Sequence, residues 1–480
     1  MMMNFNQNIL LINPPMDIQS GPPKFISFGI AYIAEKLKSC RYEAEIIDID
    51  AHRHSKEVVS ELIRKKNFDI AAIGGLVTVY PYLYWLVPEI KRLKPDSKII
   101  LGGGISTSLK ERCFEKFDID YEVIGEGEIT IIELLKELRG DKNLSSVKGI
   151  AFRNNGKIVF TEPQPLMSSL DDVPMFDDSL FPMEKLLNNS RGVFQIHTQR
   201  GCPYACTFCT NNFRGVSRKV RYRPVNDVIN EIEFFKKKYD IKLFALAGEL
   251  IMVNKTWIID FCKEVLRRKL KINYRVTSGV GTIDEEKLGW LKKSGCTTIS
   301  FGTESGSEKI LKIMQKGVTV EQGRKAILLT KKYIANIDLS MMLNYLGETR
   351  ETVRESVKFF KEMGILPNIF FAVPFPGTPL YTTAIEKGYI KDEEEYLMNL
   401  DKLSIMNLPL NLTDMPDEEA SRVMLAARNE IKRYFFWKKV FSLKIYKALL
   451  SNLKHSGFKK TVNKAINKVR EFWHETGPPH

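Results

Sequence analysis

Short apolar runs alternate with helical patterns in two separate stretches of this 480-residue chain, and this alternation limits the fold more than any other feature. In the first stretch, each of five such runs is followed by a segment with apolar residues at helical spacing. The runs are residues 8–13, 43–50, 69–77, 98–103 and 121–125. Strands that alternate with helices pair in parallel, with ligands at their carboxyl ends. We therefore predict an α/β fold that begins with a Rossmann-like domain over residues 1–140.

The alternation resumes at Val193 and predicts six further strand–helix units. The expected strands are residues 193–198, 242–247, 272–277, 298–303, 337–344 and 368–374. Six units describe a partial (β/α)6 barrel of the TIM type over residues 191–385, and barrel active sites lie at strand carboxyl ends. Residues 141–190 between the two domains contain a predicted hairpin over residues 149–161, around Asn154-Asn155-Gly156, and a proline-bearing linker.

Most of the net charge of +14 lies near the C-terminus. Between residues 431 and 470 there are twelve Lys or Arg and no Asp or Glu, whereas the rest of the chain is nearly balanced. Aromatic and aliphatic residues recur among these cations, as in helices with one apolar and one cationic face. We expect a helical basic region over residues 386–480. Three roles stay open for it: packing on the barrel with its basic face in solvent, peripheral contact with anionic lipid, or binding of RNA or an acidic substrate.

Three cysteines, Cys202, Cys206 and Cys209, stand in the loop that follows the first predicted barrel strand. Thiolates at x3 and x2 spacing can bind three irons of a four-iron cluster and leave the fourth iron open. A structural zinc site normally has four ligands, and here it would need His197 upstream. The incomplete set indicates chemistry at the metal. The remaining cysteines are scattered and are predicted to be reduced core residues, at positions 40, 113, 262 and 296.

The motif Cys-x3-Cys-x2-Cys, with Phe208 just before the last cysteine, resembles the hallmark of the radical S-adenosylmethionine (SAM) enzymes. In that family the open iron binds the amino and carboxylate groups of SAM, and an injected electron releases a 5′-deoxyadenosyl radical. A reduced cluster is a one-electron donor, and the vacant iron holds the sulfonium beside it. The resemblance implies a [4Fe-4S] cluster, SAM, and a low-potential electron donor such as flavodoxin or ferredoxin.

Other segments at the predicted strand ends resemble the SAM-binding segments of the same family. Gly248-Glu249 matches a turn that binds the SAM amino group, and a carboxylate suits an ammonium. Glu304 lies in a Gly-x-Glu-Ser-Gly run, and a purely structural role for it would need a buried cation partner. Arg221 could contact the SAM carboxylate, a phosphate or the substrate. The SAM-binding residues that the resemblance implies are Phe208, Gly248, Glu249, Ser278, Glu304 and Arg221.

The loops at the carboxyl edge of the first predicted sheet resemble the cobalamin-binding domain that precedes the barrel in one large radical SAM subfamily. The shared elements are a Ser/Thr, a Gly-Gly and a Gly-Glu-Gly-Glu segment, in that order. No Gly-x-Gly-x-x-Gly follows the first strand, which argues against NAD or FAD. The resemblance implies that cobalamin contacts Asn13, Pro14, Asp50, Thr78, Gly102, Gly103, Gly104, Gly125, Glu126, Gly127 and Glu128.

His52 is a residue of this edge that could be considered as an axial ligand of cobalt. Asp50-Ala51-His52 nearly matches the Asp-x-His-x-x-Gly motif by which some cobalamin proteins supply an axial histidine, but Ser55 replaces the glycine. The segment also follows the second strand, whereas that motif follows the first. We expect cobalamin to be bound without a histidine ligand.

Together these resemblances imply a cobalamin-dependent radical SAM enzyme. The main hypothesis is a C-methyltransferase that acts on an unactivated carbon through a 5′-deoxyadenosyl radical and methylcobalamin. An anaerobic cyclase or rearrangement enzyme that acts on a tetrapyrrole- or lipid-type substrate is the alternative. A non-catalytic iron-sulfur adaptor for nucleic acid or membranes is the hypothesis from another class.

Location and partners follow from weaker signals. The N-terminus has no signal-peptide pattern and no run of 18 apolar residues occurs, so we expect a cytoplasmic protein. The expected substrate is a small or lipid-like molecule, and the basic tail is compatible with peripheral membrane contact. Because the charge is concentrated in one tail, nucleic acid is not the expected partner.

Overall fold

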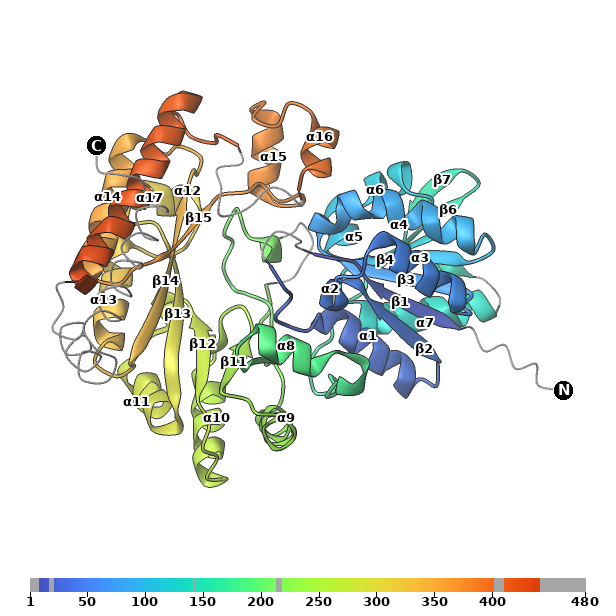
Figure 1. The fold of residues 1–480 in the computed structure, drawn as a ribbon, viewed down its shortest axis with the longest axis horizontal. Helices are drawn as coiled ribbons and strands as arrows, with labels where there is room; N and C mark the ends of the chain where they lie inside the picture. Colours follow the sequence, from blue (N-terminus) through green and yellow to red (C-terminus); the bar gives the residue numbers. More distant parts are fainter. Residues whose placement is uncertain (1–7, 17–20, 141–142, 213–217, 401–409, 441–480) are drawn as a thin grey trace, which may run out of the picture.

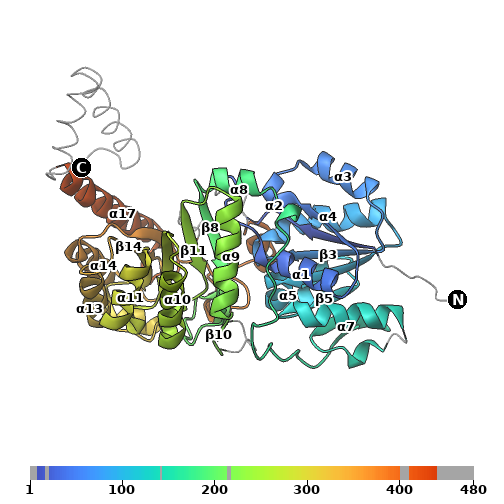
Figure 2. The same cartoon turned by 90° about the horizontal axis from the view of Figure 1, so that it is seen from below.

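The computed structural model of the protein describes residues 8–16, 21–140, 143–212, 218–400 and 410–440. Two α/β halves, each built around a sheet that is mostly or wholly parallel, lie side by side (Figures 1 and 2). The predicted sequence of a Rossmann-like domain, a partial barrel and a helical C-terminal region is confirmed in order.

The N-terminal half contains a seven-stranded sheet in the order β2-β1-β3-β4-β5-β6-β7. The first five strands are parallel, as predicted, and their alternating side chains enter two different cores. Ile9 and Leu11 pack with α1 and α7, whereas Leu10 and Ile12 pack with α3, α4 and α6. Burial on both faces explains the continuous apolar runs. The strands are β1 (Ile9–Asn13), β2 (Ala44–Asp48), β3 (Ile70–Gly75), β4 (Lys98–Gly103) and β5 (Tyr121–Val123).

Seven helices connect and flank these strands. They are α1 (Phe28–Ser39), α2 (Ile49–His52), α3 (Lys56–Lys65), α4 (Tyr80–Leu93), α5 (Gly104–Leu109), α6 (Glu111–Lys116) and α7 (Gly127–Arg139). The segment between β4 and β5 holds two helices, α5 and α6, which are separated at Lys110, whose φ of 47° interrupts helical geometry. Cys40 follows α1 and is exposed, so its predicted place in the core is wrong. Cys113, Cys262 and Cys296 are buried, as expected.

The predicted hairpin is present, but it belongs to the first sheet. Strand β6 (Ile150–Asn154) pairs antiparallel with β5, and β7 (Lys157–Phe160) pairs antiparallel with β6. Asn155 and Gly156 both have positive φ, which a two-residue hairpin turn requires. The sheet of the first half therefore continues past residue 140, where we had placed its end.

The second half contains six strands in the order β15-β14-β13-β12-β11-β8, and every neighbouring pair is parallel. This is the predicted partial barrel. Its strands are β8 (Val193–His197), β11 (Leu243–Ala247), β12 (Tyr274–Ser278), β13 (Cys296–Glu304), β14 (Asn336–Leu343) and β15 (Asn368–Phe371), and the short strands β9 (Gln199–Arg200) and β10 (Arg221–Tyr222) form a separate ribbon.

Helices cover the outer side of the barrel sheet (Figure 2). They are α9 (Val225–Lys238), α10 (Lys255–Arg267), α11 (Glu285–Ser294), α12 (Glu308–Ile313), α13 (Val320–Thr330) and α14 (Arg350–Met363), and α8 (Met183–Asn189) precedes the first barrel strand. The ends of α11 show how the sequence sets these lengths. Asp284 accepts a hydrogen bond from the Lys287 amide at its start, and Gly295, with φ of 101°, ends it.

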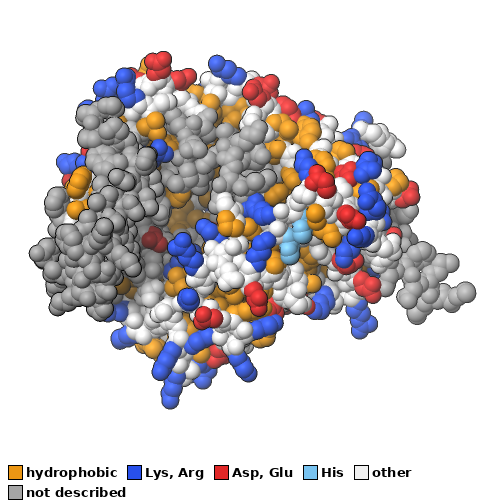
Figure 3. Space-filling view, viewed as in Figure 1, with side chains coloured by type: hydrophobic (Ala, Val, Ile, Leu, Met, Phe, Trp, Pro, Cys, Tyr) orange, Lys and Arg blue, Asp and Glu red, His pale blue; other side chains and the backbone are white. Residues whose placement is uncertain are grey.

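The C-terminal region connects both halves. Helix α15 (Pro379–Glu386) packs on residues of the barrel half, and α16 (Glu393–Met398) contacts the first half, where Arg112 pairs with Glu393 and Glu394 at 2.7 Å each. Helix α17 (Asp417–Val440) packs against α14 of the barrel through Ala420, Met424 and neighbouring residues. The basic tail from residue 441 onward, to which much of the predicted cationic region belongs, lies outside the described residues. On the side seen in Figure 3, positive and negative side chains of the described residues are interspersed.

Candidate functional site

The cysteine loop leaves the barrel immediately after β9. Gly201 has φ of 92°, and a β-carbon on it would lie 2.2 Å from the Lys219 carbonyl oxygen, so only glycine fits. The Thr207 amide donates to the Met314 carbonyl at 3.0 Å, and the Thr207 carbonyl accepts from the Leu380 amide at 2.9 Å. Two distant barrel segments therefore fix the loop between Cys206 and Cys209.

The three predicted metal ligands lie together in this loop, with Cys206 buried and Cys202 and Cys209 partly exposed. Burial raises the pKa of all three thiols, that of Cys206 to about 11, and the positive charge of Lys316 opposes this rise at each. A metal must displace the thiol protons to bind. Three thiols with a nearby cation therefore fit a negatively charged cluster.

A site for one metal ion, such as zinc, requires its ligand atoms to lie closer together than a cluster does. Within the described residues, no three His, Cys, Asp or Glu side chains converge closely enough to hold one metal ion. In a four-iron cluster each thiolate binds its own iron, so the sulfur atoms lie farther apart than around one ion. His197, which a zinc site would need as a fourth ligand, packs against Phe28 and Tyr32 of α1, with ring centroids 5.6 and 5.5 Å away.

Glu304 ends strand β13 with φ of 62°, a backbone conformation rare outside glycine. Its carboxylate accepts from Lys316 Nζ at 3.1 Å and from Ser340 Oγ at 2.9 Å. The sequence argument required a buried cation partner for a structural role, and Lys316 is that partner. Its predicted contact with SAM stays a prediction.

Two other predicted SAM residues have local partners as well. Phe208 makes an edge-to-face contact with Tyr345 at a centroid distance of 6.1 Å. Ser278 is fully buried at the end of β12, where its hydroxyl lies 2.9 Å from Thr282 Oγ1. Both therefore support the walls of the loop region through contacts within the barrel.

The turn after β11 has the features of an open binding position. A β-carbon on Gly248 would lie 2.4 Å from Gln199 Oε1, so a larger residue would have to displace the Gln199 side chain. Glu249 is mostly buried, and its Oε2 atom has no hydrogen-bond partner among the described residues. Burial raises the pKa of Glu249, and its charge acts on Cys202 and Cys209. A carboxylate with one unpartnered oxygen beside the cysteine loop suits a cationic ligand group.

Arg221 pairs with a residue of the first half, and its predicted contact with SAM stays a prediction. Its guanidinium binds both carboxylate oxygens of Glu126, at 2.8 Å each, and the Met167 carbonyl at 3.0 Å. Glu126 lies directly before α7 of the first half, and Arg200 of β9 pairs with Glu128, in the first turn of α7, at 2.5 Å. Burial acts to raise the pKa of Glu126, but the two arginines outweigh it and hold that pKa below its ordinary value. These four residues form an interdomain ion-pair network.

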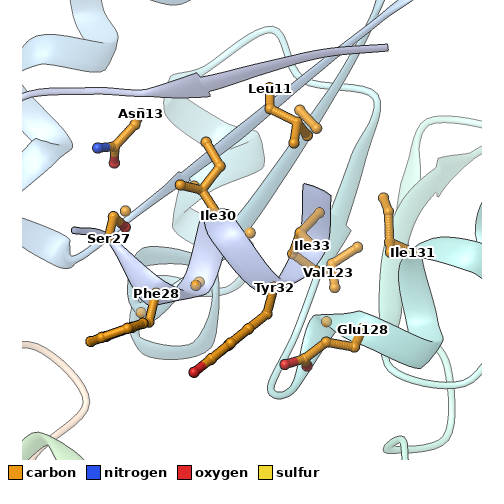
Figure 4. A pocket seen from close by; sticks show the side chains of 18 of the residues that line it. Leu11, Asn13, Ser27, Phe28, Ile30, Tyr32, Ile33, Val123, Glu128 and Ile131 are labelled. Atoms are coloured by element: carbon orange, nitrogen blue, oxygen red, sulfur yellow. The ribbon is translucent and has the colours of Figure 1, made fainter. Parts of the chain in front are cut away.

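A cavity of about 430 Å³ lies at the carboxyl edge of the first sheet, against the barrel. Figure 4 shows Asn13, Tyr32 and Glu128 among its walls. Of the residues predicted to contact cobalamin, those that line it are Asn13, Gly102, Gly103, Gly104, Gly125, Glu126, Gly127 and Glu128.

Three predicted cobalamin residues, Pro14, Asp50 and Thr78, do not line this cavity. Asp50 is buried and accepts a hydrogen bond from the Met16 amide at 3.1 Å. His52, which we expected not to bind cobalt, stacks on His54 with centroids 4.9 Å apart and is also not a cavity residue.

Several cavity residues were missed by the sequence analysis. Phe28 and Tyr32 lie on α1, and His197 and Arg200 come from the barrel. Phe28 and Tyr32 are four residues apart on a helix, and core residues have the same spacing, so the sequence does not distinguish them from the core. His197 was considered only as a zinc ligand, because its contact with α1 crosses the domain boundary.

The chemistry of the walls fits a large, amide-rich ligand such as cobalamin. A β-carbon on Gly125 would have no atom within 4 Å, so the space beside this residue is open. A β-carbon on Gly103 would lie 2.9 Å from the Gly75 carbonyl oxygen, so this position requires glycine. The buried atoms Tyr32 Oη and His197 Nδ1 have no hydrogen-bond partner in the described part of the chain. Burial lowers the pKa of His197 to about 3, so its imidazole is neutral and can donate or accept.

Comparison with known families matches this division of the chain. The sequence model of the B12 binding domain matches residues 20–135, and that of the Radical SAM superfamily matches residues 196–360. The chain belongs to the cobalamin-binding radical SAM enzymes. Its cofactors are a [4Fe-4S] cluster, SAM and cobalamin.

This radical SAM enzyme is similar in sequence to proteins described as methyltransferases and to one described as a cyclase. The chain is 28% identical over 428 residues to an uncharacterized methyltransferase, PH0819, of Pyrococcus horikoshii, covering 87% of this chain and 91% of that protein. It is 25% identical over 471 residues to a cytidylyl-2-hydroxyethylphosphonate methyltransferase of Streptomyces wedmorensis, covering 84% and 86%. It is 29% identical over 384 residues to an anaerobic magnesium-protoporphyrin IX monomethyl ester cyclase of Rubrivivax gelatinosus, covering 76% and 68%.

Solved structures share the fold at low identity. The radical SAM methyltransferase TsrM of Kitasatospora setae, with cobalamin and a [4Fe-4S] cluster bound, superposes with a TM-score of 0.72 at 17% identity, covering 88% of this chain and 91% of that one. The cobalamin-dependent radical SAM enzyme OxsB gives a TM-score of 0.71 at 18% identity, covering 97% and 75%. Among the described residues of the present enzyme, no helix is both long and apolar enough to cross a bilayer.

Proposed function

We propose that this enzyme methylates an unactivated carbon atom of a small or lipid-like substrate. One observation carries the proposal: the cysteine loop and the cavity share a wall. Arg200, two residues before Cys202, lines the cavity and pairs with Glu128 of its rim. A short-lived radical can be used only where its reaction partner is close, and a shared wall supports that proximity.

When bound, the cluster with SAM supplies a 5′-deoxyadenosyl radical and cobalamin supplies a methyl group. The residues of this chain position and shield these groups. Cys202, Cys206 and Cys209 would hold the cluster, and the free Oε2 of Glu249 would bind the SAM ammonium. Asn13 and the glycines of the cavity rim would cradle the corrin, with Tyr32 and His197 as hydrogen-bonding groups. No protein base is assigned, because radical hydrogen abstraction does not require one.

The proposal is tested by following the fate of SAM in reconstituted full-length protein under low-potential reduction, with and without cobalamin. We expect 5′-deoxyadenosine in both samples and S-adenosylhomocysteine only with cobalamin. A C202A/C206A/C209A variant should contain less than one iron per chain, against about four in the wild type, and should produce no 5′-deoxyadenosine. The absence of S-adenosylhomocysteine above the cobalamin-free level would contradict methyl transfer.

The similarity to the anaerobic magnesium-protoporphyrin IX monomethyl ester cyclase supports a second candidate, a radical cyclase or rearrangement enzyme. The two candidates predict different products from one equivalent of substrate. Methylation yields S-adenosylhomocysteine and a substrate heavier by one methyl group, whereas cyclisation yields 5′-deoxyadenosine without a methyl gain. A protein that does not cleave SAM would instead be an adaptor, for which salt-sensitive RNA binding is the test.

We also propose that flavodoxin or ferredoxin supplies the electron and that the basic tail holds the enzyme at anionic membranes. The cation-rich sequence between residues 431 and 470 supports the second proposal. Ending the chain at Val440 keeps α17, which packs on the barrel, and removes the rest of the tail. The full chain should pellet with phosphatidylserine vesicles at low salt, whereas the shortened chain should not. If both stay in the supernatant, the membrane proposal is wrong.

A further inference from the structure

Lys316 is a mostly buried cation that is not among the predicted SAM-binding residues. It lies in the turn after α12, and its side chain is 17% exposed. Its ammonium is 3.1 Å from Glu304 Oε1 and 5.6 Å from the ring centroid of Phe208, the residue directly before Cys209. The side chain is thus held between a carboxylate and an aromatic face.

The same ammonium lies beside the cysteine loop. Phe208, whose ring it faces, stands between Cys206 and Cys209, and the backbone two residues before Lys316 is hydrogen-bonded to that loop. Burial acts to lower the pKa of Lys316, but the ion pair with Glu304 at 3.1 Å opposes burial, and that pKa lies above its ordinary value. Lys316 therefore stays charged beside the site of the cluster.

The backbone holds Lys316 in this place. The Met314 carbonyl accepts from the Thr207 amide of the cysteine loop at 3.0 Å, and the Lys316 amide donates to Leu311 at 3.0 Å. A β-carbon on Gly302 would lie 3.0 Å from Lys316 Nζ and 2.7 Å from Glu304 Oε1. The glycine of the Gly-x-Glu-Ser-Gly run thus leaves room for the ion pair.

We propose that Lys316 raises the reduction potential of the cluster and that Glu304 offsets part of this effect. Reduction adds one electron, taken from the external low-potential donor, and makes the cluster more negative by one charge. A fixed cation stabilises the reduced form more than the oxidised form, and net charge near the sulfurs is an established determinant of cluster potential. The inference rests on the cluster alone, so it holds or fails independently of methylation.

The test is an anaerobic, EPR-monitored redox titration of the reconstituted full-length protein without SAM. K316M should make cluster reduction at least about tenfold less favourable, which corresponds to about 59 mV lower potential for one electron. K316R keeps the charge and should titrate like the wild type. E304Q should shift the potential upward, because it removes the opposing charge. K312M is the matched control, since Lys312 is exposed in the same segment.

Iron content separates tuning from loss of the site, because every variant compared should hold about four irons per chain. Should K316M fail to fold, the double variant K316M/E304Q removes both charges of the pair and should titrate close to the wild type. Equal potentials for K316M and K312M at full iron content would overturn the proposal. Weaker SAM binding by K316M at an unchanged potential would also overturn it and would make Lys316 a SAM ligand.

Discussion

At the scale of single residues, a buried carboxyl group stands out in the first half. Glu122 of β5 has no exposed surface, and burial raises its pKa to about 8 against the weaker opposite effects of Cys113 and Ser106. The group is therefore protonated in the folded protein near neutral pH, whereas unfolding lets it ionise above its ordinary pKa. Its contribution to stability is full below about pH 4.5 and is lost as the pH rises through 8.

We expect E122Q to remove this pH dependence. At pH 9 the variant should be more stable than the wild type by about 2–5 kcal/mol, because a neutral amide does not gain free energy by ionising on unfolding. At pH 5 the difference should vanish or reverse. Urea unfolding at both pH values measures this, with E115Q at an exposed position as the control. Parallel stability curves for E122Q and wild type would rule out Glu122 as the source.

At the scale of elements, the cysteine loop depends on a backbone shape rather than on its ligands alone. Gly201 combines φ of 92° with a carbonyl oxygen 2.2 Å from any added β-carbon. The backbone of residues 219 and 220, just before β10, lies against Gly201 and leaves no room for a β-carbon. A segment distant in sequence therefore restricts the conformation of the loop. The Thr207 contacts with Met314 and Leu380 fix its other side.

We expect G201A to fold but to bind iron poorly, because the added methyl group must push Lys219 away and shift Cys202. Iron content should fall from about four to below two per chain after reconstitution. The control is G156A, which has a similar φ of 78° but open space around the β-carbon. It should lose about 1 kcal/mol of stability from backbone strain alone and keep its iron. Full iron content in G201A would contradict the steric argument.

At the scale of the whole molecule, ion pairs connect the rim of the cavity, at Glu126 and Glu128, to the strands beside the cysteine loop. Arg200 and Arg221, on the strands that flank the cysteine loop, pair with Glu128 and Glu126 across the boundary between the halves. All four side chains are less than one-fifth exposed. Because these ion pairs join the halves at the rim of the cavity, we expect them to help set the distance between the halves there.

We expect E126Q to weaken this connection by about 2–3 kcal/mol, since it leaves a buried guanidinium with a neutral partner. The variant should retain less cobalamin after gel filtration and should be cleaved faster by protease between the halves. E286Q, which breaks the exposed pair with Lys255, is the control and should behave like the wild type. Unchanged cobalamin retention in E126Q would show that the network does not support the cavity.

How far the sequence predicts the site depends on the distance between the residues involved. The three cysteines and the glycines of the cavity rim are predicted because each set is local and lies at a strand end. The pairing of Arg221 with Glu126, 95 residues away, was not predicted. The hairpin was predicted correctly, yet its pairing with β5 was missed, because hairpin turns are local signals and the choice of an edge strand is not.

The sequence by itself determined the two α/β halves, their order, the cluster motif and the family, because these depend on periodicity and on short motifs. Only the tertiary structure decided that Lys316 neutralises Glu304, that His197 and Tyr32 line the cavity, and that two arginines join the halves. The physical reason is that a buried charge pairs with whichever opposite charge lies beside it in the folded chain. The sequence contains many opposite charges and does not show which of them is near.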